Sequence, residues 1–139
     1  MAILVLDTSV VLKWFTEENY SETALKIREG FYKGLHGIVE PDLLLYEFSN
    51  AMRYNPNYSP EDVNKAVESL FELQIDVVAP TLEVLRNASE LARKYGITVY
   101  DAVFVALAKS IEAEFVTADE KLYNKVKELK FVRFIAEFQ

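Results

Sequence analysis

The sequence predicts an α/β domain in which helices cover both faces of a largely parallel sheet. Short apolar runs alternate with longer amphipathic segments along the chain, and neither an internal repeat nor a long linker interrupts this alternation. The length of 139 residues fits one domain. We therefore expect residues 1–139 to form one three-layer α/β/α sandwich around a central parallel sheet of about five strands.

The expected strands are short and apolar. Ala2–Leu6 is apolar throughout, as expected for a parallel strand that is buried on both faces. No basic residue precedes this short segment, and Asp7 follows it directly. We therefore interpret it as a strand and not as a signal peptide. The other expected strands are residues 38–40, 75–78, 114–117 and 131–134.

The expected helices follow from capping residues and periodicity. Ser21 and Ser59 are natural N-caps, Pro41 and Pro60 suit a first helical turn, and Gly96 suits a helix end. The expected helices are residues 9–15, 21–33, 41–54, a helix from residue 59, residues 80–95, a strongly apolar and therefore buried helix from residue 101, and a last helix from residue 119.

Composition excludes several kinds of chemistry. There is no cysteine, which excludes disulfides, thiolate zinc sites and cysteine nucleophiles. The only histidine, His36, lies between Gly34 and Gly37, a pattern typical of an exposed turn. The net charge of −7 argues against a broad basic groove for duplex nucleic acid, although bound cations reverse the local charge of an acidic site. No apolar run approaches a membrane span, so we expect a cytoplasmic protein.

Four acids form the candidate site. Asp7 and Asp119 each follow an expected strand, at the edge where open α/β sheets bind ligands, and Asp101 begins the buried helix. Any of these three could simply cap a helix. Glu47 lies inside a helix and has no capping role, although it could belong to a solvated stripe with Asn50.

If these carboxylates converge, a cation must balance them. Several carboxylates a few ångströms apart cannot all stay ionised without a counter-ion. A site made only of oxygen ligands suits Mg²⁺, with Mn²⁺ as a substitute. Such an ion activates water and neutralises charge on a phosphate, so no protein nucleophile is needed.

Four runs around these acids carry a family resemblance. They are residues 4–10 (LVLDTSV), 45–48 (LYEF), 99–102 (VYDA) and 116–122 (VTADEKL). Together and in this order they resemble the PIN domain, and more narrowly the VapC ribonuclease toxins of VapBC toxin–antitoxin pairs. The resemblance implies metal-dependent cleavage of single-stranded RNA, a homodimer or higher homo-oligomer, and a cognate VapB-like antitoxin.

The resemblance also assigns roles to individual residues. The family's catalytic, metal-binding quartet falls on the four acids Asp7, Glu47, Asp101 and Asp119. The family's small hydroxyl residues fall on Thr8, Ser9 and Thr117. Ser9 or Thr117 could bond a carboxylate or a metal-bound water, whereas Thr8 and Ser9 could equally cap the following helix.

Competing classes fail at specific positions. A haloacid-dehalogenase-like phosphatase requires a second Asp where this chain has Ser9, and a receiver domain requires an Asp where the third strand ends in Ala79. A catalytically silent PIN-like module that binds RNA or protein stays open as the alternative.

Contacts to substrate and partner are less defined. Lys13, Arg53 and Lys121 could bind phosphates or be ordinary surface charges. Trp14 and Phe15 could pack in the core, or could line an antitoxin groove or a dimer face.

Overall fold

The centre of the molecule is a parallel sheet of five strands. The computed structural model describes residues 1–138, and its strand order is β3-β2-β1-β4-β5, with every neighbouring pair parallel. The strands are β1 (Ala2–Leu6), β2 (His36–Pro41), β3 (Asp76–Val78), β4 (Glu114–Thr117) and β5 (Val132–Phe134). The predicted parallel sheet of about five strands is therefore confirmed.

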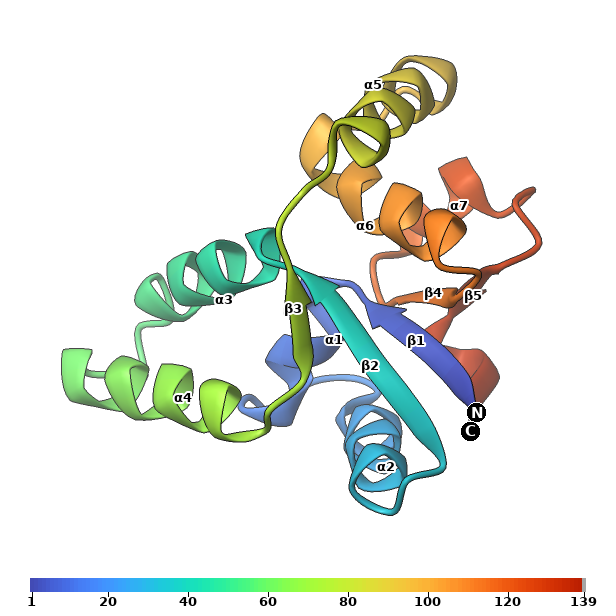
Figure 1. Cartoon of the computed structure of the whole chain (residues 1–139). Helices are drawn as coiled ribbons and strands as arrows, with labels where there is room; N and C mark the ends of the chain where they lie inside the picture. The colour runs from blue at the N-terminus through green and yellow to red at the C-terminus, as the bar shows by residue number, and fades with distance from the viewer. Residues whose placement is uncertain (139) are drawn as a thin grey trace.

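Helices cover both faces of this sheet. They are α1 (Thr8–Val11), η1 (Leu12–Trp14), α2 (Ser21–Tyr32), α3 (Leu43–Arg53), α4 (Pro60–Glu72), α5 (Leu82–Tyr95), α6 (Val99–Ser110), α7 (Glu120–Val126) and η2 (Ile135–Phe138). Figure 1 shows α1 to α4 on one side of the strands and α5 to α7 on the other. The predicted three-layer α/β/α architecture is confirmed.

The strand order also locates the place where a ligand site is expected. From β1 the chain moves outward to β2 and β3, and then returns to place β4 on the opposite side of β1. The connections that leave β1 and β4 therefore diverge to opposite sides of the sheet, and in open α/β sheets the ligand crevice is expected at such a point, outside the carboxyl ends of the two strands. Asp7 and Asp119 lie directly after β1 and β4.

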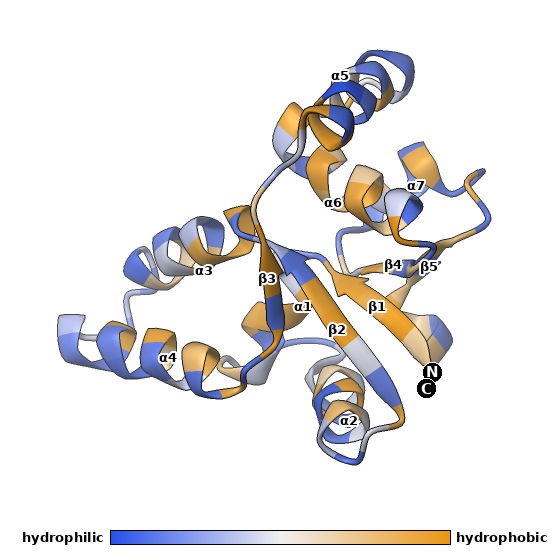
Figure 2. Ribbon diagram, in the orientation of Figure 1, coloured by the Kyte–Doolittle hydropathy of each residue, from blue (hydrophilic) through white to orange (hydrophobic). Residues whose placement is uncertain are grey.

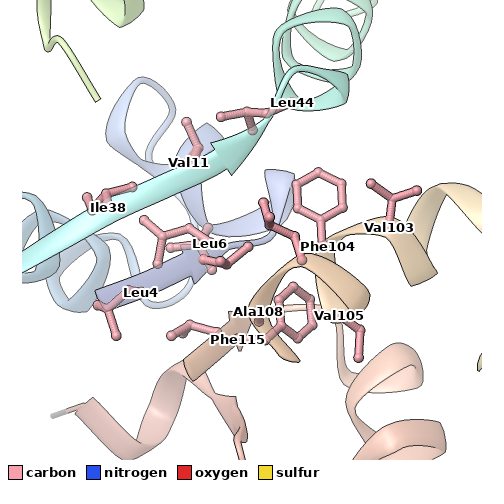
Figure 3. Close-up of a cluster of buried hydrophobic side chains, with 14 of the residues drawn as sticks. Leu4, Leu6, Val11, Ile38, Leu44, Val103, Phe104, Val105, Ala108 and Phe115 are labelled. Atoms are coloured by element: carbon pink, nitrogen blue, oxygen red, sulfur yellow. The ribbon is translucent and has the colours of Figure 1, made fainter. Parts of the chain in front are cut away.

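The core lies on both faces of β1 and around α6. Every residue from Ala102 to Ala108 is buried, as the all-round apolar sequence of this helix predicts. Figure 2 shows the same pattern, with β1 and α6 strongly hydrophobic and the outer faces of α2, α4 and α5 hydrophilic. In Figure 3, Leu6 of β1 lies between Val11 on one side and Phe104 of α6 on the other. Within residues 1–138, no helix combines the length and the apolarity needed to cross a membrane.

Several expected element boundaries are wrong. Pro41 ends β2 instead of opening a helix, and α3 begins after Asp42. Tyr20, not Ser21, occupies the N-cap of α2, in a left-handed conformation with φ of 68°. His36 does not lie in an exposed turn: it begins β2, is half-buried, and its Nε2 lies 2.8 Å from the carbonyl oxygen of Ile27.

Candidate active site

Asp7 is held rigidly at the carboxyl end of β1. Its side chain is only 6% exposed, and its Oδ2 accepts hydrogen bonds from Ser9 Oγ at 2.6 Å and from Thr117 Oγ1 at 2.8 Å. Its backbone N–H donates to the carbonyl oxygen of Val116 in β4 at 2.9 Å. The position of this carboxylate is therefore set by both strands that border the crevice.

The same two hydroxyls connect Asp7 to the loop that carries Asp119. Thr117 Oγ1 accepts the Asp119 backbone N–H at 3.0 Å, and Ser9 Oγ accepts the Ala118 backbone N–H at 3.0 Å. Each hydroxyl donates to the carboxylate and accepts from the β4–α7 turn, so both use their donor and an acceptor position. The ends of β1 and β4 are thus held together by side chains after their backbone pairing ends.

Glu47 points toward the same end of the sheet. It lies on α3, is half-buried, and its Oε1 accepts a hydrogen bond of 2.7 Å from Thr8 Oγ1. Because Thr8 directly follows Asp7, this bond places the Glu47 carboxylate beside the β1–α1 junction. Glu47 is therefore not part of a solvated stripe, although Asn50, one turn later on the same helix, is exposed.

Asp101 is the third residue of α6, not its cap. Thr98 takes that role, and its Oγ1 accepts the Asp101 backbone N–H at 3.0 Å. The Asp101 carboxylate is half-buried, and its pKa is raised by burial and by the negative charge of Asp119. The hydrogen bond with Thr98 and the positive charge of Lys125 oppose this rise in pKa.

Asp119 has a capping role in addition to its place near the other acids. It is the N-cap of α7, and its Oδ1 accepts the Leu122 backbone N–H at 3.1 Å. The expectation that Asp119 could cap a helix is therefore correct, and this role uses one of its two carboxylate oxygens. It does not exclude a second role, because a carboxylate has two oxygens.

Proximity of these acids to one another shows in their pKa values. Burial raises the pKa of Asp7 to about 6, the bonds from Ser9 and Thr117 oppose this rise, and the charges of Asp101 and Glu47 add to it. The pKa of Glu47 is also raised, first by burial and then by the charge of Asp101. Negative charges at this place therefore make Asp7, Glu47 and Asp101 harder to ionise, which is the condition that a bound cation relieves.

The donor atoms fit a hard cation, but they do not form a ready-made coordination shell. All the candidate ligands are carboxylate oxygens, the kind that Mg²⁺ and Mn²⁺ take. Among residues 1–138, no group of three or more Asp, Glu or His side chains is arranged to hold a metal ion. The four acids are neighbours that affect one another's charge without a chelating geometry.

Glu40 is a residue of this site that sequence reasoning misses. It lies near the end of β2, is completely buried, and its Oε2 accepts the backbone N–H of Leu6 at 3.1 Å. Burial and the charge of Asp7 raise its pKa well above the usual range, while the Leu6 bond opposes this rise. No signal in the sequence marks this residue, because its burial follows from the position of β2 between β1 and β3 in the folded sheet.

The basic residues near the acids differ in character. Lys13 is not an ordinary surface charge: it is buried, and its Nζ lies 3.1 Å from Glu18 Oε1. Arg53 is exposed and lies over the ring of Tyr54, 4.6 Å from the ring centre. Lys121 is exposed on α7.

The aromatic pair after α1 is divided between core and surface. Trp14 is buried, and its Nε1 donates to the carbonyl oxygen of Ala24 at 2.8 Å, so its role is core packing. Phe15 packs edge-on against Phe48 with ring centres 5.1 Å apart and is only partly buried.

The fold and the acids at its crevice define a class of protein. The chain belongs to the PIN domain family, whose model matches residues 4–128. The resemblance seen in the four acidic runs is therefore confirmed.

Within this family, the chain is similar to a protein named as a VapC ribonuclease and has the fold of chains from toxin–antitoxin complexes. The chain is 32% identical to Ribonuclease VapC3 of Pyrobaculum aerophilum over 126 residues, which cover 88% of this chain and 93% of the relative. A toxin–antitoxin complex from Klebsiella pneumoniae contains a chain of the same fold, with a TM-score of 0.70 at 12% identity, covering 95% of this chain and 97% of that one. VapBC-1 of nontypeable Haemophilus influenzae contains another, with a TM-score of 0.66 at 19% identity, covering 96% and 98%.

Proposed function

We propose that this chain is a VapC-type endoribonuclease that cleaves single-stranded RNA by water attack and requires a divalent cation, with Mg²⁺ as the natural ion. One observation carries the proposal. The four acids lie close enough together for charges within the group to shift pKa values: Asp101 and Glu47 raise the pKa of Asp7, Asp101 raises that of Glu47, and Asp119 raises that of Asp101. The relative from Pyrobaculum aerophilum is named as a ribonuclease, and the family resemblance assigns the acidic quartet to these four residues of this chain.

The hydrogen bonds of the site leave oxygens available for a cation. Both hydroxyl bonds to Asp7 end on Oδ2, Thr8 bonds Oε1 of Glu47, and the α7 cap uses Oδ1 of Asp119. In each of these three acids a hydroxyl or amide fixes one oxygen, and the other oxygen can face a ligand. These oxygens of Asp7, Glu47 and Asp119, together with the Asp101 carboxylate, would hold the cation.

The chemistry follows from the charges of this arrangement. A bound Mg²⁺ lowers the pKa of water and offsets negative charge on the phosphate. The four acids would hold that ion, and the hydroxyls of Ser9 and Thr117 fix the orientation of the Asp7 carboxylate for it. The high pKa of Asp7 means that cation binding releases protons when the free site is partly protonated.

The partner we propose is a VapB-like antitoxin segment that lies in the groove between α2 and α4. Two cavities of about 470 and 500 Å³ share Trp14 and Phe15 in their lining, and a third of about 280 Å³ shares Phe15 and continues along α4 to Lys65. Phe15, which is only partly buried, gives this groove an aromatic floor that suits an amphipathic peptide, and a basic side chain of that peptide could reach the acids. Homodimer formation and a cytoplasmic location stay predictions of the family resemblance and the sequence.

The test is cleavage of an unstructured RNA oligonucleotide. We expect cleavage with Mg²⁺ or Mn²⁺, none with a chelator, and none by Asp7→Asn or Glu47→Gln. The matched control is Glu68→Gln, a change of the same kind at an exposed position on α4, which should leave the rate unchanged. A wild-type protein that binds RNA but cuts none with any divalent cation would establish the silent binding module instead.

A further inference from the structure

The carboxyl group of Glu40 is in an unusual place for a charged residue type. It is completely buried in the middle of a parallel sheet, and its Oε1 has no hydrogen-bond partner among the described residues. A buried polar oxygen without a partner costs stability, and an apolar side chain of similar volume would avoid that cost. Core packing alone therefore does not explain a glutamate at this position.

The backbone around Glu40 shows what the side chain replaces. Pairing between β1 and β2 runs from Ala2 opposite His36 to Leu4 opposite Ile38. Two residues further along β1, the N–H of Leu6 bonds the side chain of Glu40 and not a main-chain carbonyl of β2. The carboxyl thus takes over where the β1–β2 ladder ends.

This contact lies one residue before the central acid of the site. The next N–H along the chain, that of Asp7, donates in the other direction, to Val116 of β4. The carboxyl end of β1 is therefore hydrogen-bonded to β4 on one side and to the Glu40 side chain on the other. If the Glu40 bond is lost, one of the two anchors that set the Asp7 backbone is lost too.

We propose that Glu40 is a positioning residue for the active site, which holds the end of β1 through the Leu6 amide and thereby places the Asp7 carboxylate. The proposal rests on the proposed function, because it assigns Glu40 a part in the same site. Glu40 itself binds neither cation nor RNA, since its side chain is completely buried. What the site requires of it is an acceptor oxygen at the right distance from Leu6.

Three variants separate this role from a general effect on folding. Glu40→Gln keeps an acceptor oxygen at the same reach and should behave like the wild type. Glu40→Leu removes the acceptor, and Glu40→Asp withdraws it by one methylene. Ile38→Ala is the matched control, because Ile38 is a buried residue of the same strand whose truncation destabilises the core without touching the Leu6 amide.

The first readout needs neither metal nor RNA. In amide NMR spectra of Glu40→Gln, the Leu6 N–H should keep its chemical shift and its slow hydrogen exchange. In Glu40→Leu and Glu40→Asp, its resonance should move and its hydrogen exchange should become faster. The Asp7 amide, which bonds β4, is the internal control for an intact β1–β4 pair. In Ile38→Ala, both amides should keep their hydrogen-bonded shifts.

The second readout is the site itself. Titration with Mn²⁺ alone should show weaker binding in Glu40→Leu than in Glu40→Gln or Ile38→Ala. RNA cleavage by Glu40→Leu should fall roughly ten- to a hundredfold, mainly in kcat, because a misplaced catalytic group costs rate even when substrate still binds. If Glu40→Leu does not fold, Glu40→Asp takes its place in both measurements.

The outcomes distinguish the two proposals. The positioning role is overturned if Glu40→Leu binds Mn²⁺ and cleaves RNA as well as Ile38→Ala does, or if Glu40→Gln loses as much as Glu40→Leu. A wild-type protein that neither binds Mn²⁺ nor cleaves RNA overturns the proposed function, and with it any part of Glu40 in catalysis. The Leu6 amide then still reports whether Glu40 anchors β1.

Discussion

Replacing Asp7 by asparagine should abolish activity and at the same time make the metal-free protein more stable at neutral pH. Asp7 is buried beside two other acids, so its ionised form is costly in the folded protein. An asparagine has the same shape, and its Oδ1 can accept the bonds that Ser9 and Thr117 now donate to Oδ2. The substitution therefore removes the charge and can keep the hydrogen bonds.

The size of the effect follows from the pKa of Asp7. Burial raises this pKa from an ordinary 3.8 to about 6. Between these values the native protein binds more protons than the unfolded chain, so the stability of the wild type falls as pH rises through this window. At about 1.36 kcal/mol for each unit of pKa shift, Asp7→Asn should be more stable than the wild type by about 3 kcal/mol at neutral pH. The advantage should disappear once the pH is below 3.8, where Asp7 is protonated in both states.

Urea unfolding with a chelator present, at about pH 7.5 and again near pH 4, measures this difference. The control is Asp76→Asn, the same chemical change at an exposed residue of β3, which should alter stability by less than about 0.5 kcal/mol. Adding Mg²⁺ should stabilise the wild type and have less effect on Asp7→Asn, because only a protein that binds the ion gains from it. A variant less stable than the wild type at pH 7.5, or a difference that does not change with pH, would refute the reasoning.

Three further predictions concern single contacts. Thr117→Val removes the hydroxyl that links Asp7 to the β4–α7 turn, and cleavage should slow roughly ten- to a hundredfold while circular dichroism stays unchanged. Ser59→Ala removes the capping box of α4 and should lower the free energy of unfolding by about 1 kcal/mol without changing cleavage of RNA. Gly30→Ala places a Cβ 2.6 Å from His36 Cε1 and should destabilise the protein by roughly 1–3 kcal/mol. Adding His36→Ala should restore part of that loss, and no recovery would contradict the steric explanation.

The sequence by itself determined the class of fold and the identity of the four acids. Strand and helix periodicity are local properties, so the alternation from Ala2–Leu6 onward identifies a parallel α/β sheet. Acids at the carboxyl ends of β1 and β4 are predictable because parallel strands end at one edge. Element boundaries are less predictable, as Pro41 shows: proline suits a first helical turn and equally suits the end of a strand.

Only the tertiary structure decided which polar side chains are buried and what they contact. Nothing local distinguishes Glu40 from any acid in a half-exposed strand, because its burial results from β1, β3 and the helices around it. The hydroxyl of Thr117 meets Asp7 across 110 positions of sequence. Such contacts depend on strand order and on where the β1–β2 ladder ends, and these are set by the packing of the whole chain. The four acids were visible in the sequence, and the structure added the groups that hold them in place.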